Sequence, residues 1–132
     1  MKNMDKKRLN RSFLDEFEDY DFSKINEEKI FLVGSISKAK EEFIKIESIL
    51  QILHNKLVSI CSVDGLLNKE KFSVEEWDIL QEIALKKLKE QDAILVLDIN
   101  NYIGTESKEE IEYVRYDLKK PVYYLSELKK EI

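Results

Sequence analysis

Four short apolar runs alternate along this chain with amphipathic stretches of helical period. The clearest run covers residues 93–97, five apolar residues between Asp92 and Asp98. A short run without polar alternation is typical of a strand covered on both faces, as in a parallel sheet with helices on either side. Similar runs occur at residues 30–33, 57–61 and 122–125. Each is predicted to be a strand, and the strand at residues 57–61 is expected to be buried.

A strongly amphipathic stretch follows the first strand and predicts a helix from Ser37 onward. Its core-facing stripe consists of Ala39, Phe43, Ile46, Leu50 and Leu53. A second apolar side is formed by Ile44, Ile49 and Ile52. One sheet face cannot cover both sides, so the second requires another partner, either the N-terminal segment or a second subunit.

Two further helices are predicted after the second and third strands. Ser73 and Glu76 form a capping box, in which each side chain satisfies the backbone N–H of the other residue. The buried stripe of this helix is Trp77, Leu80, Ala84 and Leu88. The third helix places Ile111, Val114 and Leu118 on its inner face and is followed by Pro121, which starts the last strand.

The resulting β-α-β-α-β-α-β order predicts a three-layer α/β sandwich of the flavodoxin or Rossmann type. We expect a short parallel sheet of about four strands in the order 2-1-3-4. This order places a switch point between the first and third strands, and ligands of open sheets bind there, beyond the carboxyl ends of the strands. The turn 34–37 and the loop 98–110 follow these two strands.

The chain is divided by these patterns into an amphipathic extension, residues 1–28, and an α/β domain, residues 29–132. Within the extension, apolar residues fall at helical spacing among many charges between residues 6 and 20: Leu9, Phe13, Leu14, Phe17 and Tyr20. The pattern fits an N-terminal helix. It also fits an arm that becomes ordered only on a partner.

Composition excludes several classes of function. With 22 basic and 27 acidic residues the net charge is −5, which argues against binding a nucleic acid polymer. The single cysteine, Cys61, lies in an apolar run and is expected to be a buried thiol. Neither a secretory signal nor a membrane-spanning stretch is evident, so we expect a cytoplasmic protein that does not contact a membrane. Metal-ligand spacings, a P-loop and a Ser-His-Asp set are also missing, and no metal or cofactor is expected.

Polar residues concentrate in the two segments at the switch point. In the turn, Gly34 lets the chain bend, and Ser35 and Ser37 offer hydroxyls beside a helix N-terminus that favours an anion. Ser37 has the alternative role of a simple helix cap. In the loop, Asp98, Asn100, Asn101 and Tyr102 follow the strand.

Gly104 makes the turn into the last helix, whose first turns are rich in acidic residues. For Glu106, Glu109 and Glu112 we expect only a favourable interaction with the helix dipole. His54, the only histidine, is expected to be a surface cation at the C-terminal end of the first helix.

The stretch DAILVLDINNYIGTESKEEIEYVRYDLKKPVYYL, residues 92–125, resembles the C-terminal half of nucleoside 2-deoxyribosyltransferase-like proteins and nucleotide N-glycosidases. The turn GSIS, residues 34–37, is similar to their N-terminal nucleotide-binding turn. The resemblance covers about residues 29–126 and is loose between residues 56 and 73. It implies a nucleoside or nucleotide ligand, cleavage or transfer at an N-glycosidic bond, and a homodimer.

The resemblance also implies roles for particular residues. Glu110 matches the glutamate that attacks the anomeric carbon, and it would lie at the N-terminus of the last helix, where the dipole favours its ionised form. The turn would hold a phosphate or hydroxyl group through Gly34, Ser35 and Ser37. The sugar or base would be approached by Asp98, Asn100 and Tyr102, with Gly104 and Ser107 in the turn beside them.

Two departures from the family pattern keep other functions open. Ala84 stands where members with glycosidase activity commonly carry a polar residue, and Asn100-Asn101 replaces glycines. These changes would fit a nucleotide-binding module without catalysis. A structural or partner-binding protein is a third hypothesis, based on the charged N-terminal segment and the extra apolar side of the first helix.

Overall fold

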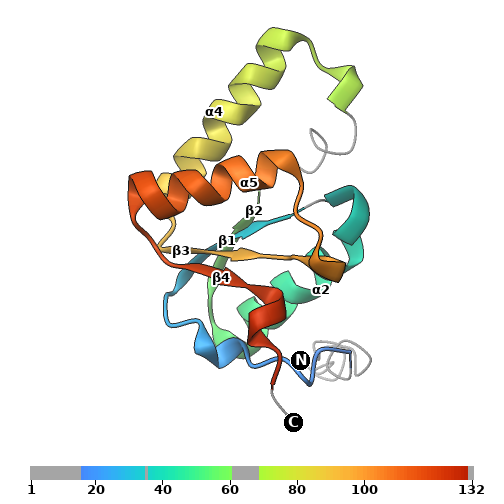
Figure 1. The fold of residues 1–132 in the computed structure, drawn as a ribbon, viewed down its shortest axis with the longest axis vertical. Coiled ribbons are helices and arrows are strands. Elements are labelled where there is room, and N and C mark those ends of the chain that lie inside the picture. Colours follow the sequence, from blue (N-terminus) through green and yellow to red (C-terminus); the bar gives the residue numbers. More distant parts are fainter. Residues whose placement is uncertain (1–15, 35, 61–68, 131–132) are drawn as a thin grey trace, which may run out of the picture.

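The computed structural model describes residues 16–34, 36–60 and 69–130. In this part of the chain four strands form one parallel sheet, β1 (Lys29–Val33), β2 (Leu57–Ile60), β3 (Ala93–Val96) and β4 (Val122–Tyr124). The strand order is β2-β1-β3-β4 (Figure 1). The predicted α/β fold and strand order are therefore confirmed.

Helices cover both faces of the sheet, because alternate residues of the central strands point to opposite sides. Helix α2 (Ile36–His54) covers one face, where Ile30 and Leu32 of β1 join its core cluster. Helices α4 (Val74–Glu90) and α5 (Thr105–Glu112) lie on the other face, where Phe31 and Val33 join a second cluster (Figure 1). The two clusters make the three layers expected from the sequence.

Strand β2 differs from the prediction in its burial. We expected a buried strand over residues 57–61, but β2 is an edge strand whose first residue, Leu57, is 55% exposed. The remaining residues of β2 are only partly buried. Apolar residues alone did not separate an edge strand from a central one such as β3, in which every residue is buried. Cys61 lies outside the described residues.

The stripe predicted for α2 is correct in its middle and wrong at its end. Phe43, Ile46 and Leu50 are buried, whereas Leu53 is 53% exposed. The side chain of Ala39 lies outside the description. Ile49, which we assigned to the second apolar side, is buried in the same core cluster as Phe17 and Phe22, so the N-terminal segment supplies part of the missing partner. Ile44 and Ile52 remain exposed.

The segment before β1 belongs to the main core. Phe17, Phe22 and Ile25 are buried with residues of α2 and the sheet. Tyr20 forms an isolated antiparallel bridge with Lys129. Most of the helix predicted over residues 6–20 lies outside the described residues, and the chain forms a turn between residues 17 and 19. Through the bridge to Lys129, the segment 17–25 lies beside the C-terminal end of the described chain.

Helix α4 begins and ends at identifiable contacts. The Ser73 hydroxyl accepts from the Glu76 backbone N–H at 3.1 Å, and the Glu76 carboxylate accepts from the Ser73 N–H at 2.9 Å, which confirms the predicted capping box. At the other end, the Lys120 ammonium donates to the carbonyls of Lys89 and Gln91, both at 2.6 Å. These bonds satisfy carbonyls that the helix end leaves free.

Helix α5 continues directly into a π-helical segment, Tyr113–Leu118. Lys119 ends it in a left-handed conformation, with φ of 56°, two residues before Pro121. As predicted, Ile111 and Val114 are buried, and Leu118 is partly buried. Across the described residues, the helices are too short or too polar to span a membrane.

Candidate functional site at the carboxyl edge of the sheet

The two segments predicted at the switch point come together beyond β1 and β3. The Leu97 N–H donates to the Val33 carbonyl at 2.7 Å, which extends the pairing of the two strands. Gly34 follows directly, and a Cβ atom there would lie 3.2 Å from the Leu97 carbonyl oxygen and 3.3 Å from a ring carbon of Phe43. Gly34 thus permits the close approach of the turn to the end of β3.

Asp98 is hydrogen-bonded to the segment that follows β4. Its two carboxylate oxygens accept from the Ser126 backbone N–H at 3.0 Å and from the Ser126 hydroxyl at 2.6 Å. The side chain is buried, with 9% of the residue exposed. Ser126 lies in the 3₁₀ turn Leu125–Leu128 that follows β4, so Asp98 joins the carboxyl ends of β3 and β4. Asp98 also lines the pocket described next, and its contact with a ligand stays a prediction.

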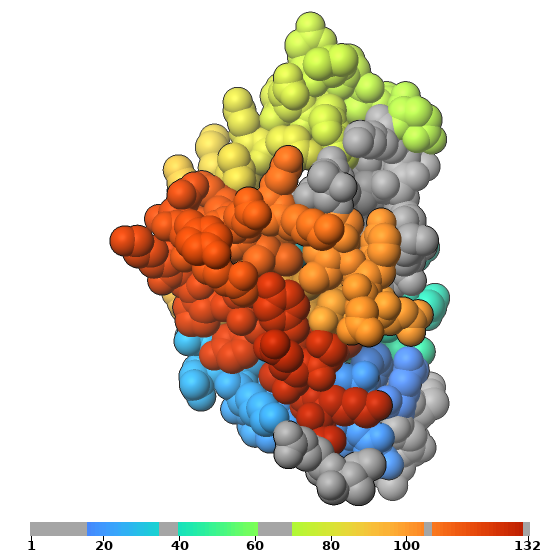
Figure 2. Space-filling model, viewed as in Figure 1, coloured from blue at the N-terminus to red at the C-terminus, as the bar shows by residue number. Residues whose placement is uncertain are grey.

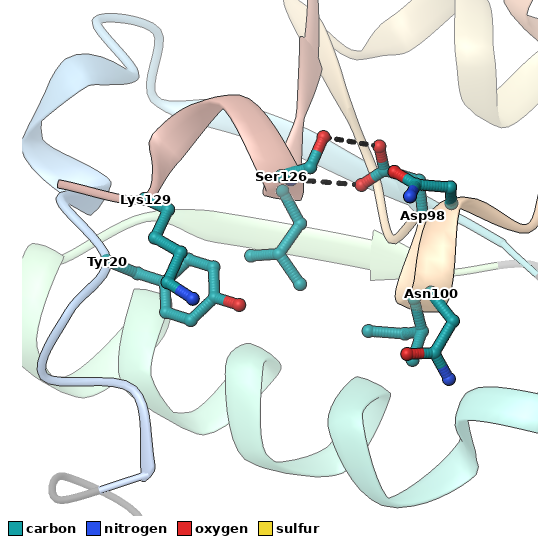
Figure 3. A pocket seen from close by; sticks show the side chains of 8 residues that line it. Tyr20, Asp98, Asn100, Ser126 and Lys129 are labelled. Carbon is teal, nitrogen blue, oxygen red and sulfur yellow. Dashed lines mark hydrogen bonds between the residues drawn. The ribbon is translucent and has the colours of Figure 1, made fainter. Parts of the chain in front are cut away.

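A pocket of about 280 Å³ opens beside this pair (Figure 3). Its polar lining comes from three segments that are far apart in sequence: Tyr20 before β1, Asp98 to Asn101 after β3, and Ser126 and Lys129 after β4. Figure 3 shows Tyr20 and Lys129 on one side of the pocket and Asn100 on the other. Ile99 and Leu125 add an apolar wall.

The loop at the mouth of the pocket has an unusual backbone. Asn100 and Asn101 have φ angles of 55° and 63°, in the left-handed region that asparagine tolerates better than most residues. Asparagine is therefore suited to both positions. Both side chains are exposed and line the pocket.

The pocket has the chemistry of a site for an anionic or hydroxyl-rich ligand. Lys129 supplies a cationic donor, the two asparagine amides supply donors and acceptors, and Tyr20 supplies a hydroxyl. The apolar wall beside them suits the flat face of a base or a sugar ring. In the described part of the chain, no cluster of three or more histidine, cysteine or acidic side chains could hold a metal ion.

The remaining predicted residues lie in the loop and helix beyond this pocket. Gly104 is the N-cap of α5, and a Cβ there would lie 3.7 Å from the Tyr102 hydroxyl. Ser107 is buried, with 6% exposed, and Glu110 follows it by three residues and is partly buried. Residues three apart share a helix face, so both lie on the side of α5 that turns toward the body of the protein.

Glu110 differs from the prediction in its relation to the helix end. Because α5 begins at Thr105, Glu110 lies in the second turn rather than at the N-terminus. The influence of the helix dipole falls off within the first turn, so the dipole is not the main source of any stabilisation of its charge. Glu110 is also absent from the lining of the 280 Å³ pocket.

The structure therefore brings together only some of the predicted residues. Asp98 and Asn100 share the pocket, whereas Tyr102, Gly104, Ser107 and Glu110 form a second group along the loop and α5. Ser35 and the side chain of Ser37 lie outside the described residues. The polar lining residues outside the predicted loop were missed, namely Tyr20, Ser126 and Lys129, as was the apolar wall of Ile99 and Leu125. Ser126 could have been found, since a 2-1-3-4 sheet places the residue after β4 next to the residue after β3.

His54 is not the surface cation that we predicted. It is partly buried, and its ring lies edge-on to Phe22 at a centroid distance of 6.0 Å. Burial, together with the nearby Lys56 charge, lowers its pKa below the usual 6.5, against a smaller opposite effect of Asp21. The lowered pKa favours the neutral imidazole, and the ring belongs to the packing of the N-terminal segment on α2.

Comparison of the chain with protein-family models, with curated proteins and with solved structures found no match.

Proposed function

We propose that this protein binds a nucleoside or nucleotide at the carboxyl edge of its sheet and cleaves or transfers at the N-glycosidic bond. The observation that carries the proposal is the meeting of the Gly34 turn with the end of β3, at the switch point of a 2-1-3-4 sheet. The segments that meet there are those that resemble nucleoside 2-deoxyribosyltransferase-like proteins and nucleotide N-glycosidases.

Glu110 is the nucleophile in this proposal. A carboxylate oxygen of Glu110 forms a bond to the anomeric carbon while the bond from that carbon to the base breaks, and the base leaves with the bonding electrons and takes a proton from solvent. Water or a second base then attacks the anomeric carbon, and the carboxylate is released. Support comes from the position of Glu110 one turn beyond the buried Ser107, on the inward side of α5.

The polar pocket is assigned to ligand binding. Lys129, Asn100 and Asn101 would contact a phosphate or sugar hydroxyl groups, and Tyr20 would close the other side. Asp98 would act indirectly, by holding the turn after β4 in place through Ser126. It is a positioning residue rather than a ligand contact.

A nucleotide-binding module without catalysis is the second candidate. It is favoured by the separation of Glu110 from the pocket lining and by Ala84, a small buried residue of α4 at a position that is commonly polar in glycosidases. Binding without turnover distinguishes this candidate from the enzyme.

A thermal-shift screen followed by chromatography tests both candidates. The purified protein is heated with nucleosides, deoxynucleosides and their monophosphates, and each stabilising compound is incubated and analysed for released base. Ligands that bind only the folded state raise Tm by mass action. We expect at least one such compound and release of its base. Binding without release would support the second candidate, and the absence of any thermal shift would contradict both.

A further inference from the structure

A second pocket, of about 250 Å³, lies between the N-terminal segment and the C-terminal end of α2. Its lining includes three buried side chains, Phe17, Phe22 and Ile49. It also includes two side chains that reach solvent, Tyr20 and Leu53. The pocket is therefore open at the surface and has a largely apolar interior.

This second pocket is separate from the candidate site. Tyr20 is the one residue that lines both pockets. Its bridge with Lys129 joins the N-terminal segment to the C-terminal turn, and Figure 2 shows the two beside each other at the surface, the segment in blue and the turn in red. The candidate site includes residues of the C-terminal turn, whereas the second pocket includes residues of α2. The function proposed above assigns no ligand to the second pocket.

The apolar lining fits one small ring system. The rings of Phe17, Tyr20 and Phe22 form a cluster in which the centroids lie 5.7 to 6.5 Å apart. Aromatic rings pack well against a further ring that enters such a cluster. Sites for drug-sized ligands have volumes from about 300 Å³ upward, so a pocket of about 250 Å³ suits a smaller molecule with one ring and a short side arm.

Glu18 gives this pocket a negative charge that its neighbours do not neutralise. Its side chain is exposed, and within the described ranges of the chain no side chain forms an ion pair or a hydrogen bond with its carboxylate. Glu16, by contrast, is paired with Lys45 at 2.6 Å. The ammonium group of Lys56 donates to two backbone carbonyls before β1, at 2.7 and 2.9 Å. The carboxylate of Glu18 is thus available to a cationic ligand.

His54 adds a polar group to the lining without adding a positive charge. Its ring lies edge-on to Phe22, and burial lowers its pKa, so the neutral imidazole is favoured. A neutral imidazole has one nitrogen that accepts a hydrogen bond and one that donates, so it does not repel a cation. The aromatic rings nearby attract a cation as well.

We propose that this pocket binds a small organic cation, a primary amine joined by a short linker to one apolar ring. The ring packs against the aromatic cluster and Leu53, and the ammonium group lies at the rim, beside Glu18. Glu18 selects the charge of the ligand, and the volume of the pocket limits its size. This site is independent of the N-glycosidic chemistry proposed above.

Titration with phenethylamine, followed by NMR at constant pH, tests this site. His54 is the only histidine of the chain and lines the pocket, so its ring protons report on this position alone. We expect a saturable shift of these signals, with a dissociation constant on the order of millimolar for so small a ligand. Phenylacetate has the same ring with a carboxylate in place of the amine, and it should bind at least about ten-fold more weakly. No saturable shift with phenethylamine, or equal or tighter binding of phenylacetate, overturns the proposal.

Substitutions at the rim test the residues themselves. Glu18→Gln removes the charge and should weaken phenethylamine binding about three- to five-fold, without weakening phenylacetate binding. Glu28→Gln, at an exposed glutamate outside the lining, is its control. Leu53→Gln should weaken phenethylamine binding about three-fold, whereas Ile52→Gln, at a 59% exposed neighbour outside the lining, should not. All four positions are exposed, so the variants keep the core. An unchanged phenethylamine affinity in both Glu18→Gln and Leu53→Gln overturns the site.

Discussion

Both carboxylate oxygens of Asp98 accept hydrogen bonds from Ser126, and the residue is buried where β3 ends. Hydrogen bonds to a charged group contribute about 1.5–3 kcal/mol, so Asp98→Ala should lower the free energy of unfolding by about 2–3 kcal/mol. Ser126→Ala keeps the backbone N–H bond and should cost only about 1 kcal/mol. Chemical denaturation measures both values.

A double-mutant cycle distinguishes this pair from independent effects. If Asp98 and Ser126 act through each other, the double variant should be no less stable than Asp98→Ala alone. Additive losses would contradict the contact. The cycle also separates the positioning role of Asp98 from ligand binding, because it is measured without any ligand.

The partly buried His54 predicts a pH effect on stability. Its pKa in the folded state lies below 6.5. As pH falls below 6.5, the unfolded chain takes up a proton more readily than the folded chain, and the folded state loses stability. Between about pH 7.5 and about pH 5.5, Tm should fall more for the wild type than for His54→Gln. Equal falls in Tm would show that His54 has no part in the pH dependence.

For single residues, the sequence predicted the positions of polar side chains better than it predicted the residues that they contact. Asp98 and Asn100 were expected at the carboxyl edge and lie there, but the bond from Asp98 to Ser126 depends on the pairing of β3 with β4. The prediction that His54 is a surface cation was wrong because its position at the end of α2 gives no information about Phe22. Phe22 comes from a segment before β1, and its ring packs against His54.

At the scale of elements, the turn between β1 and α2 is constrained by contact with β3. A Cβ at Gly34 would lie 3.2 Å from the Leu97 carbonyl and 3.3 Å from Phe43, tighter than ordinary contact. Gly34→Ala should therefore destabilise the protein by about 1–3 kcal/mol. Gly104→Ala is the control for steric crowding, since its Cβ would meet only Tyr102, at 3.7 Å. Alanine is a poorer N-cap than glycine, so this variant should lose about 0.5 kcal/mol.

Thermal or chemical denaturation of the two glycine variants gives the comparison. A loss at Gly34 no larger than at Gly104 would mean that the turn and β3 can separate without cost, and the switch-point geometry would then be looser than the structure indicates.

Local patterns were sufficient to identify the elements themselves. Residues 93–97 predicted the central strand β3, and Ser73 with Glu76 predicted the start of α4. The burial of β2 and the exposure of Leu53 were not predictable in this way. An edge position and the point where a helix passes the sheet are set by tertiary neighbours rather than by the period of apolar residues.

At the scale of the whole molecule, the N-terminal segment and the C-terminal turn complete the candidate site together. The Asp21 N–H donates to the Leu128 carbonyl at 2.8 Å, and the Lys130 N–H donates to the Asp19 carbonyl at 2.6 Å. This pairing brings Tyr20 and Lys129 to the pocket. Contacts between segments more than 100 residues apart leave no local signal, which is why both residues were missed.

Base release by a Glu110→Gln variant is the most direct measurement of the proposed chemistry. With a deoxynucleoside or nucleotide that the screen identifies, wild type, Glu110→Gln and Glu109→Gln are compared in initial rate and in thermal shift. Glu109 is the matched control, as an exposed glutamate on the same helix. We expect a loss of about a thousand-fold or more in kcat for Glu110→Gln, with binding retained, and a near wild-type rate for Glu109→Gln. A Glu110→Gln variant that releases base at the wild-type rate would contradict this role of Glu110.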